Sequence, residues 1–197
     1  MLRKITKKLR QPIVTLGVAI IWFYYIPLAI AGQLRDGTIF FDRPPRLLDA
    51  FTYSSDANVW GARYYFVVEL PDNAGEPLKK VVIQQRVGQE RIRFFLQRTS
   101  AFLGTPDRRK SNLNIAEVTQ NEATRSITVI FDSPISPGSI FTVALRPRRN
   151  PRFGGIYLFG VEVFPAGEKS SGLYLGPGRF HFYQGDRFKL HRYRFYP

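Results

Sequence analysis

The chain has 197 residues, 15% of them aromatic, and no cysteine, which excludes disulfide bonds and thiolate metal sites. Its 29 Lys and Arg residues outnumber its 15 Asp and Glu residues. The resulting net charge of +14 predicts attraction to anionic surfaces in general, without selecting one of them.

The first 31 residues have the pattern of an export signal. Residues 1–12 carry five basic side chains, and residues 13–31 form an uncharged apolar run that ends in Ala29-Ile30-Ala31. This small-x-small ending predicts cleavage after Ala31 and a mature protein that begins at Gly32. An uncleaved membrane anchor is the alternative, because nineteen apolar residues nearly span a bilayer. The rest of the chain keeps 24 basic residues against all 15 acidic ones, a net charge of +9.

Apolar alternation and turn signals predict eight or nine short strands after the signal segment. They cover residues 37–42, 62–70, 78–85, 91–97, 115–119, 126–131, 140–145, 155–164 and 179–183. Residues 47–60 and 99–112 lack a clear period and are predicted to be loops, the first with a possible helical turn. We expect 62–70 and 78–85 to form a hairpin-like pair, and a Pro-Gly hairpin at Pro137-Gly138 to join 126–131 to 140–145.

Residues 155–164 are the most strand-like run. Both of their faces are largely apolar, which predicts a strand covered on both sides. Phe159 and Val161 are expected to be buried and to pack against the face that carries Phe66 and Val68. We therefore predict an all-β fold: a single immunoglobulin-like antiparallel β-sandwich over residues 32–183, after the signal segment over 1–31. Residues 184–197 form a basic aromatic tail.

Several segments together resemble an exported family, known mainly from cyanobacteria and catalogued as domain of unknown function 2808. They are YYFVVELPDNAGEPLKKVVIQQ, AFLGTP, ITVIFDSPISPGSIFTVALRPRRNP and GGIYLFGVEVFPAGEKSSGLYLGPGRFHFY. The resemblance extends over about residues 40–183 and leaves out the tail. It implies an exported envelope protein and supplies no catalytic residue. The segment FDSPISPGSIFTVAL is also similar to hairpins of bacterial immunoglobulin-like modules.

No motif in the chain identifies a catalytic, cofactor or metal site. His181 and His191, with Asp186 as the nearest carboxylate, match no ligand spacing, so a surface or stacking role is predicted for them. Glu69 and Glu162 are the acids that lie within otherwise apolar strands. If both point into one cleft, the chain could be an enzyme that acts on envelope glycan; otherwise each faces solvent or pairs with an arginine.

Three basic clusters are the candidate anion-contacting residues, with a solvated basic face as the alternative. They are Arg108, Arg109 and Lys110; Arg146, Arg148, Arg149 and Arg152; and, in the tail, Arg187, Lys189, Arg192 and Arg194. The leading hypothesis is a non-catalytic protein of the periplasm or cell envelope. Its partner would be an anionic envelope polymer, a membrane surface or an acidic protein, and export argues against nucleic acid.

The tail itself leaves two interpretations open. Its cations interleave with aromatic side chains, a composition that suits an anionic membrane surface. The alternative is an additional edge strand that covers the sheet.

Overall fold

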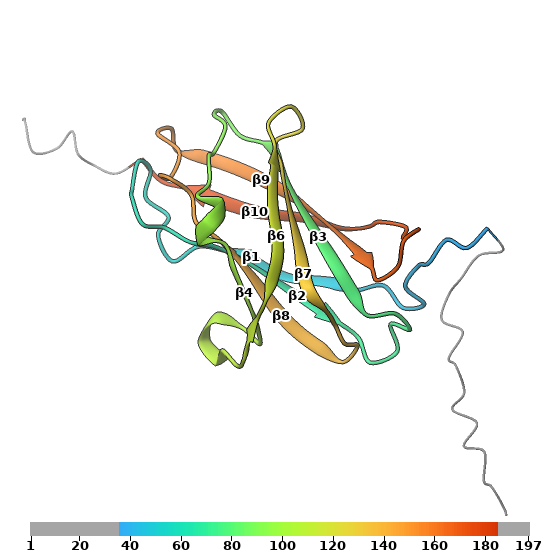
Figure 1. Ribbon diagram of the computed structural model, residues 1–197. Helices are drawn as coiled ribbons and strands as arrows, with labels where there is room; N and C mark the ends of the chain where they lie inside the picture. Colours follow the sequence, from blue (N-terminus) through green and yellow to red (C-terminus); the bar gives the residue numbers. More distant parts are fainter. Residues whose placement is uncertain (1–35, 185–197) are drawn as a thin grey trace, which may run out of the picture.

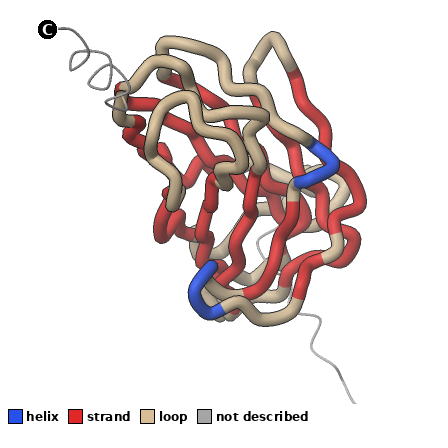
Figure 2. The backbone as a smooth tube through the Cα atoms, turned by 90° about the vertical axis from the view of Figure 1, so that its left-hand side faces the viewer, coloured by secondary structure: helices blue, strands red, loops and turns tan. Residues whose placement is uncertain are grey.

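The computed structural model describes residues 36–184, which form two five-stranded sheets packed face to face (Figure 1). The strand orders are β1-β2-β8-β4-β5 and β10-β9-β3-β7-β6, and all neighbouring strands are antiparallel. The strands are β1 (Arg46–Phe51), β2 (Tyr64–Leu70), β3 (Leu78–Val87), β4 (Ser100–Leu103), β5 (Asn112–Leu113), β6 (Ile115–Asn121), β7 (Ser126–Ile135), β8 (Ser139–Leu145), β9 (Gly155–Pro165) and β10 (Leu173–Phe182). Two single-turn 3₁₀ helices, η1 (Leu96–Arg98) and η2 (Pro106–Arg108), interrupt the loops (Figure 2).

The strand order is that of an immunoglobulin domain with an insertion. Strands β1-β2-β8-β4 correspond to A-B-E-D of such a domain, and β10-β9-β3 correspond to G-F-C. The antiparallel pair β6 and β7 lies between the D and E equivalents in the sequence and extends the second sheet beyond β3. The predicted all-β, immunoglobulin-like antiparallel sandwich is confirmed.

The core lies between the sheets and is built by strand alternation. Phe66 and Val68 of β2 and Phe159 and Val161 of β9 are all buried, and the ring centroids of Phe66 and Phe159 are 5.9 Å apart. The inward orientation predicted for these four residues is confirmed. Large aromatic side chains fill much of the space between the layers: Tyr64, Phe66, Phe131, Phe141, Tyr157, Phe159, Phe180 and Phe182.

The prediction that β9 is covered on both faces is wrong. Its outward residue Ile156 is 42% exposed, and the other outward apolar positions are only partly covered. Long side chains from neighbouring strands provide this partial cover: the Lys80 ammonium lies 3.6 Å from the centre of the Phe164 ring. Aliphatic stems can shield apolar surface while their charged ends stay in water, which is why apolar residues tolerate this face.

Both predicted hairpins are also wrong. Strands β2 and β3 belong to different sheets, and so do β7 and β8. Gly138, with φ of +79°, turns the chain from one sheet to the other, and its N–H donates to the Leu70 carbonyl over 2.9 Å. A Pro-Gly turn bends the chain in either case, so the local sequence does not show whether the following strand stays in the same sheet.

Four local predictions are corrected by tertiary pairing. The predicted loops 47–60 and 99–112 contribute β1 and β4, because β2 and β8 offer them edges to pair with. The predicted strand 37–42 is reduced to a single bridge between Ile39 and Ser170. The predicted strand 91–97 makes one bridge, from Phe94 to Pro147, before η1 begins, since it crosses from one sheet to the other.

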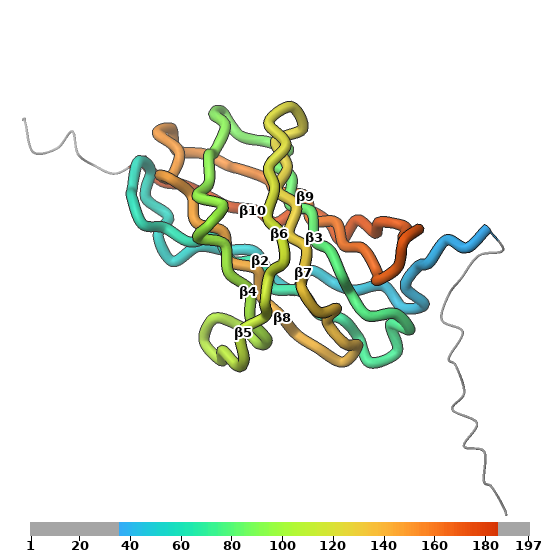
Figure 3. Tube along the Cα trace, viewed as in Figure 1, coloured from blue at the N-terminus to red at the C-terminus, as the bar shows by residue number. Residues whose placement is uncertain are grey.

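The two ends of the described chain lie at opposite ends of the sandwich (Figure 3). Asp36 pairs with Lys169, just after β9 ends, whereas the Gln184 side chain accepts the Gly154 N–H, just before β9 begins. The eleven residues of β9 separate these points by roughly 33 Å. The predicted signal, and the predicted tail apart from its first residue Gln184, lie outside residues 36–184, and within that range no helix is long and apolar enough to cross a membrane.

Candidate functional site: an arginine-rich cleft

An open cleft of about 670 Å³ lies at the end of the sandwich where β8 stops and β9 starts. Five of its lining residues are arginines, and one is an acid. The lining consists of Trp60, Glu90, Arg91, Ile92, Arg93, Arg148, Arg149, Asn150 and Arg152. Three loops that are distant in sequence therefore meet at one cationic concavity.

Backbone pairing between two of these loops aligns the arginines. The Phe95 N–H donates to the Arg146 carbonyl over 2.9 Å, and the Arg148 N–H donates to the Arg93 carbonyl over 2.8 Å. Because this segment is extended, its side chains alternate. Ile92 and Phe94 are buried, so Arg91 and Arg93 project outward.

Asn150 ties the loop that carries Trp60 to the arginine loop. Its side chain is buried, accepts the Tyr64 hydroxyl over 2.9 Å, and donates to the carbonyls of Ser54 and Asp56 over 2.7 and 2.9 Å. Its own N–H donates to the Val59 carbonyl over 2.8 Å, immediately before Trp60. Asn150 thus holds the loop that carries Trp60 against the arginine loop through both its side chain and its backbone N–H.

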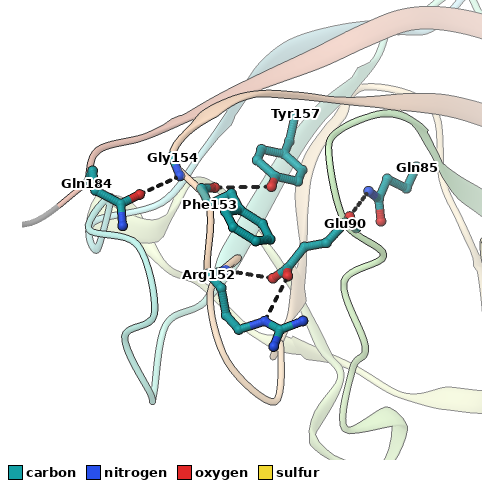
Figure 4. Close-up of polar contacts among 7 residues, drawn as sticks. All are labelled: Gln85, Glu90, Arg152, Phe153, Gly154, Tyr157 and Gln184. Carbon is teal, nitrogen blue, oxygen red and sulfur yellow. Dashed lines mark hydrogen bonds and ion pairs between the residues drawn. The ribbon is translucent and has the colours of Figure 1, made fainter.

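A second buried amide, Gln85, shapes the opposite wall of the cleft (Figure 4). Its Nε2 donates to the Glu90 carbonyl over 2.7 Å, and its Oε1 accepts the Ile92 N–H over 2.9 Å. The turn between Gln85 and Glu90 requires a glycine at position 88. Gly88 has φ of +145°, and a Cβ there would lie 2.2 Å from the Tyr157 ring. The Glu90 carboxylate, held by this wall, accepts the N–H and the Nε of Arg152 over 2.6 and 3.2 Å.

Two buried tyrosines support the cleft from beneath. Burial raises the pKa of Tyr64 well above its usual value, and the nearby Tyr157 and Glu90 raise it further. Burial, followed by the charge of Glu90, also raises the pKa of Tyr157. Both hydroxyls therefore stay protonated at neutral pH and act as donors, Tyr64 to Asn150 and Tyr157 to the Phe153 carbonyl.

Three of the five arginines have no carboxylate partner among residues 36–184. Arg152 pairs with Glu90 and Arg91 pairs with Glu122, whereas Arg93, Arg148 and Arg149 form no ion pair. The Arg148 guanidinium lies 5.6 Å from the centre of the Phe95 ring, and that of Arg149 lies 5.7 Å from the Trp60 ring. A planar guanidinium group that has no carboxylate partner can bind a carboxylate or phosphate ligand by donating two parallel N–H hydrogen bonds.

The structure divides the predicted basic clusters. Arg148, Arg149 and Arg152 line the cleft, but Arg146 does not. The Arg146 carbonyl accepts the Phe95 N–H in the backbone pairing described above. Arg108 and Lys110 line a separate shallow cleft of about 410 Å³ near the start of β8, roughly 20 Å away along that strand.

The remaining predicted cations lie outside both clefts. Arg109 lines neither of them: its guanidinium lies 4.5 Å from the centre of the Phe102 ring and donates to Asn112 over 2.6 Å. The four tail cations lie outside the described residues.

Sequence reasoning missed Trp60, Glu90, Arg91 and Arg93 as site residues. The alternation in RIRF did place Arg91 and Arg93 on one face, which was the available signal. Nothing local indicated that this face would lie beside the RPRRNP loop, because the two are brought together by long-range pairing around the Phe94–Pro147 bridge and by the Glu90–Arg152 contact.

The two acids proposed for glycan chemistry are separated by the core. The neighbours of Glu69 in β2 and of Glu162 in β9 point inward, so these carboxylates lie on the opposite outer faces of the sandwich. Glu69 pairs with Arg46, with 2.6 Å between Oε2 and Nη2. A glycosidase needs its two carboxylates on either side of one bond, so the assignment to Glu69 and Glu162 is wrong.

The histidines do not form a metal site within the described part of the chain, which contains no cluster of potential ligands. The His181 ring lies 4.4 Å from that of Tyr183, with an angle of 37° between the ring planes, so the two rings are in tilted contact. His191 and Asp186 lie outside residues 36–184.

Residues 38–182 match the family described as protein of unknown function (DUF2808). The chain belongs to this family. The match contains every residue of the arginine cleft and nearly coincides with the resemblance inferred from the motifs. No curated protein matches this DUF2808 chain.

Several solved structures are similar to the DUF2808 domain. The C-terminal domain of the antigen I/II polypeptide BspA of Streptococcus agalactiae is 14% identical, with a TM-score of 0.43 over 70% of this chain and 49% of that one. The collagen-binding domain of a Staphylococcus aureus adhesin is 8% identical (TM-score 0.34; 62% and 87% covered). The collagen-binding subdomain of the Enterococcus faecalis surface protein ACE is also 8% identical (TM-score 0.36; 71% and 94%). The chain spans about half the length of the first of these. At these sequence identities and TM-scores, the similarities support no conclusion about ligands.

Proposed function

We propose that this protein is exported to the periplasm or cell envelope, where it binds an anionic polymer through the arginine cleft and performs no catalysis. The observation that carries the proposal is the convergence on one concave surface of Arg93, Arg148 and Arg149, which have no carboxylate partner among residues 36–184. A solvated basic face would scatter its cations and would not recess them between loops held by two buried amides.

The shape of the site favours a polymer segment over a membrane surface. The cations line a concavity of about 670 Å³, within the range of sites that enclose a small ligand. A lipid headgroup layer is met best by side chains that protrude from a convex surface, so a single extended chain is the better match to a recess.

The tail begins beside the same cleft. The Tyr183 N–H donates to the Ser55 carbonyl over 2.8 Å, and Gln184 accepts the N–H of Gly154, two residues after Arg152. The cations Arg187, Lys189, Arg192 and Arg194 follow within ten residues of this point. We propose that they contact the same polymer, which would make the two cationic segments act as one bivalent site.

Removing residues 185–197 is expected to leave the melting temperature unchanged and to weaken binding to a long polyanion by about tenfold, because one of two linked contacts is lost. Binding should also become less sensitive to salt. Isothermal titration and thermal unfolding of the full and shortened chains check this. A markedly lower melting temperature with unchanged affinity would instead assign the tail to the edge of a sheet.

The proposed function is tested by neutralising the unpaired arginines. The triple variant Arg93→Gln, Arg148→Gln and Arg149→Gln is expected to lose about 100-fold in affinity for polygalacturonate, since each charge-assisted contact contributes about 1 kcal/mol or more. The matched control replaces three exposed arginines outside the cleft, Arg43, Arg125 and Arg179, and makes the same change in net charge.

The cleft is supported as the binding site only if the cleft variant loses polymer affinity and the control variant does not. If the control variant weakens binding as much as the cleft variant, net charge alone accounts for it and the proposed site is wrong. Vesicles that contain anionic lipid are measured in parallel, and tighter binding to vesicles than to the polymer would assign the protein to a membrane surface.

A further inference from the structure

The indole of Trp60 is the one cleft feature that attraction between charges does not explain. Its side chain is 70% exposed, although exposed tryptophan is uncommon in a surface without a binding role. The backbone around it is held on both sides: the Asn150 N–H donates to the Val59 carbonyl, and the Asn58 N–H donates to the Pro151 carbonyl over 2.7 Å. The ring is therefore presented to solvent from a segment with a defined position.

We infer that the cleft recognises a polymer of carboxylate-bearing sugar rings, a deepening that rests on the proposed function. A pyranose ring has an apolar C–H face, which packs on an aromatic ring, and a uronic acid carries its carboxylate at the edge of that ring. The cleft pairs the two matching features, because the Arg149 guanidinium lies 5.7 Å from the Trp60 ring. The guanidinium group then donates hydrogen bonds to the ligand carboxylate, while the apolar face of the sugar ring packs on the indole.

The cleft already holds one carboxylate of the chain itself. The Glu90 carboxylate accepts hydrogen bonds from both the backbone N–H and the Nε of Arg152. Donors at this site therefore bind a carboxylate in a fixed orientation. Because Arg152 is paired with Glu90, the arginines left to bind ligand carboxylates are Arg93, Arg148 and Arg149, the last of which lies 5.7 Å from the Trp60 ring.

Other polyanions fit less well. A linear polyphosphate has no ring and makes no use of an exposed indole. Single-stranded nucleic acid is usually held by several aromatic platforms that stack successive bases. Within the described residues Phe95 is only partly exposed and is flanked by the guanidinium groups of Arg98 and Arg148, at 5.4 and 5.6 Å, while the exposed ring of Phe153 adjoins the paired Arg152. Trp60, the most exposed of these rings, lies beside arginines that have no carboxylate partner among residues 36–184, and this combination matches a sugar ring with an acidic group.

The test separates the ring contact from the charge contact. Galacturonate oligomers and linear polyphosphate of equal charge are titrated into the full chain and into Trp60→Ala, Trp60→Phe and the triple arginine variant. We expect Trp60→Ala to lose at least about tenfold in affinity for the oligomer and to bind polyphosphate within about twofold of the parent. Trp60→Phe should retain most of the oligomer affinity, and the triple variant should lose affinity for both ligands.

Fluorescence gives a second reading. The chain has two tryptophans, Trp22 and Trp60, so the Trp22→Phe variant makes Trp60 the sole reporter. Its emission should shift to the blue with the galacturonate oligomer and stay in place with polyphosphate.

The outcomes separate the inference from the function on which it rests. If Trp60→Ala leaves oligomer affinity unchanged while the arginine variant loses it, the sugar-ring inference is wrong and the anion-binding function stands. If the arginine variant binds both ligands as the parent does, the proposed function fails. Tighter, Trp60-dependent binding of an oligothymidylate of equal charge would identify the ligand as nucleic acid and overturn the inference.

Discussion

Replacing Phe159 with alanine is expected to lower the free energy of unfolding by about 4 kcal/mol, the usual cost of removing a buried phenylalanine ring. Phe159 is 1% exposed, and its ring lies 5.9 Å from that of Phe66 and 6.0 Å from that of Tyr64, both in the opposite sheet. The variant thus leaves a cavity between the two layers that well-packed neighbours cannot easily close.

The matched control is Ile156→Ala in the same strand. Ile156 points to the outer face and is 42% exposed, so its replacement should cost about 1 kcal/mol or less. Chemical denaturation of the two variants measures the difference. An unchanged midpoint for Phe159→Ala, or equal losses for both variants, would contradict the inward orientation of Phe159 and with it the facing of β9 on β2.

Replacing Asn150 with alanine is expected to cost about 3 kcal/mol, because three polar groups lose the Asn150 side chain as their hydrogen-bond partner. These are the Tyr64 hydroxyl and the carbonyls of Ser54 and Asp56. The loop that carries Trp60 should also be held less firmly, because only its backbone hydrogen bonds to Asn150 and Pro151 remain, so polymer affinity should fall in the molecules that remain folded.

Tyr64→Phe is the control for the Asn150 variant. It removes one of the three contacts, keeps the aromatic ring in the core, and should cost about 1 kcal/mol. Denaturation curves and titrations with polymer are compared for the two. If Asn150→Ala is no more destabilising than Tyr64→Phe, the amide does not hold the two loops together, and the description of how the cleft is built is wrong.

Where a strand is long and its apolar residues alternate strongly, the sequence alone predicted which residues face the core and which face outward. Strands β2 and β9 have buried residues at every second position, so the inward orientation of Phe66, Val68, Phe159 and Val161 followed from period two alone. The first sheet shows the limit of this signal, because Phe102 and Thr142 are buried on its outer face. The loop after β4 covers them: Thr142 donates to the Gly104 carbonyl, and the Arg109 guanidinium lies over the Phe102 ring.

What the sequence by itself determined was the all-β class, the family and the excess of positive charge, since these depend on composition and on neighbouring residues. The tertiary structure alone decided which sheet each strand joins, and it alone brought Trp60, Arg93 and Arg148 to one cleft. The physical reason is the range of the interactions. Alternation and turn preference act over a few residues, whereas the Phe94–Pro147 bridge and the Asn150–Tyr64 hydrogen bond join residues 53 and 86 positions apart and form only when the whole sandwich closes.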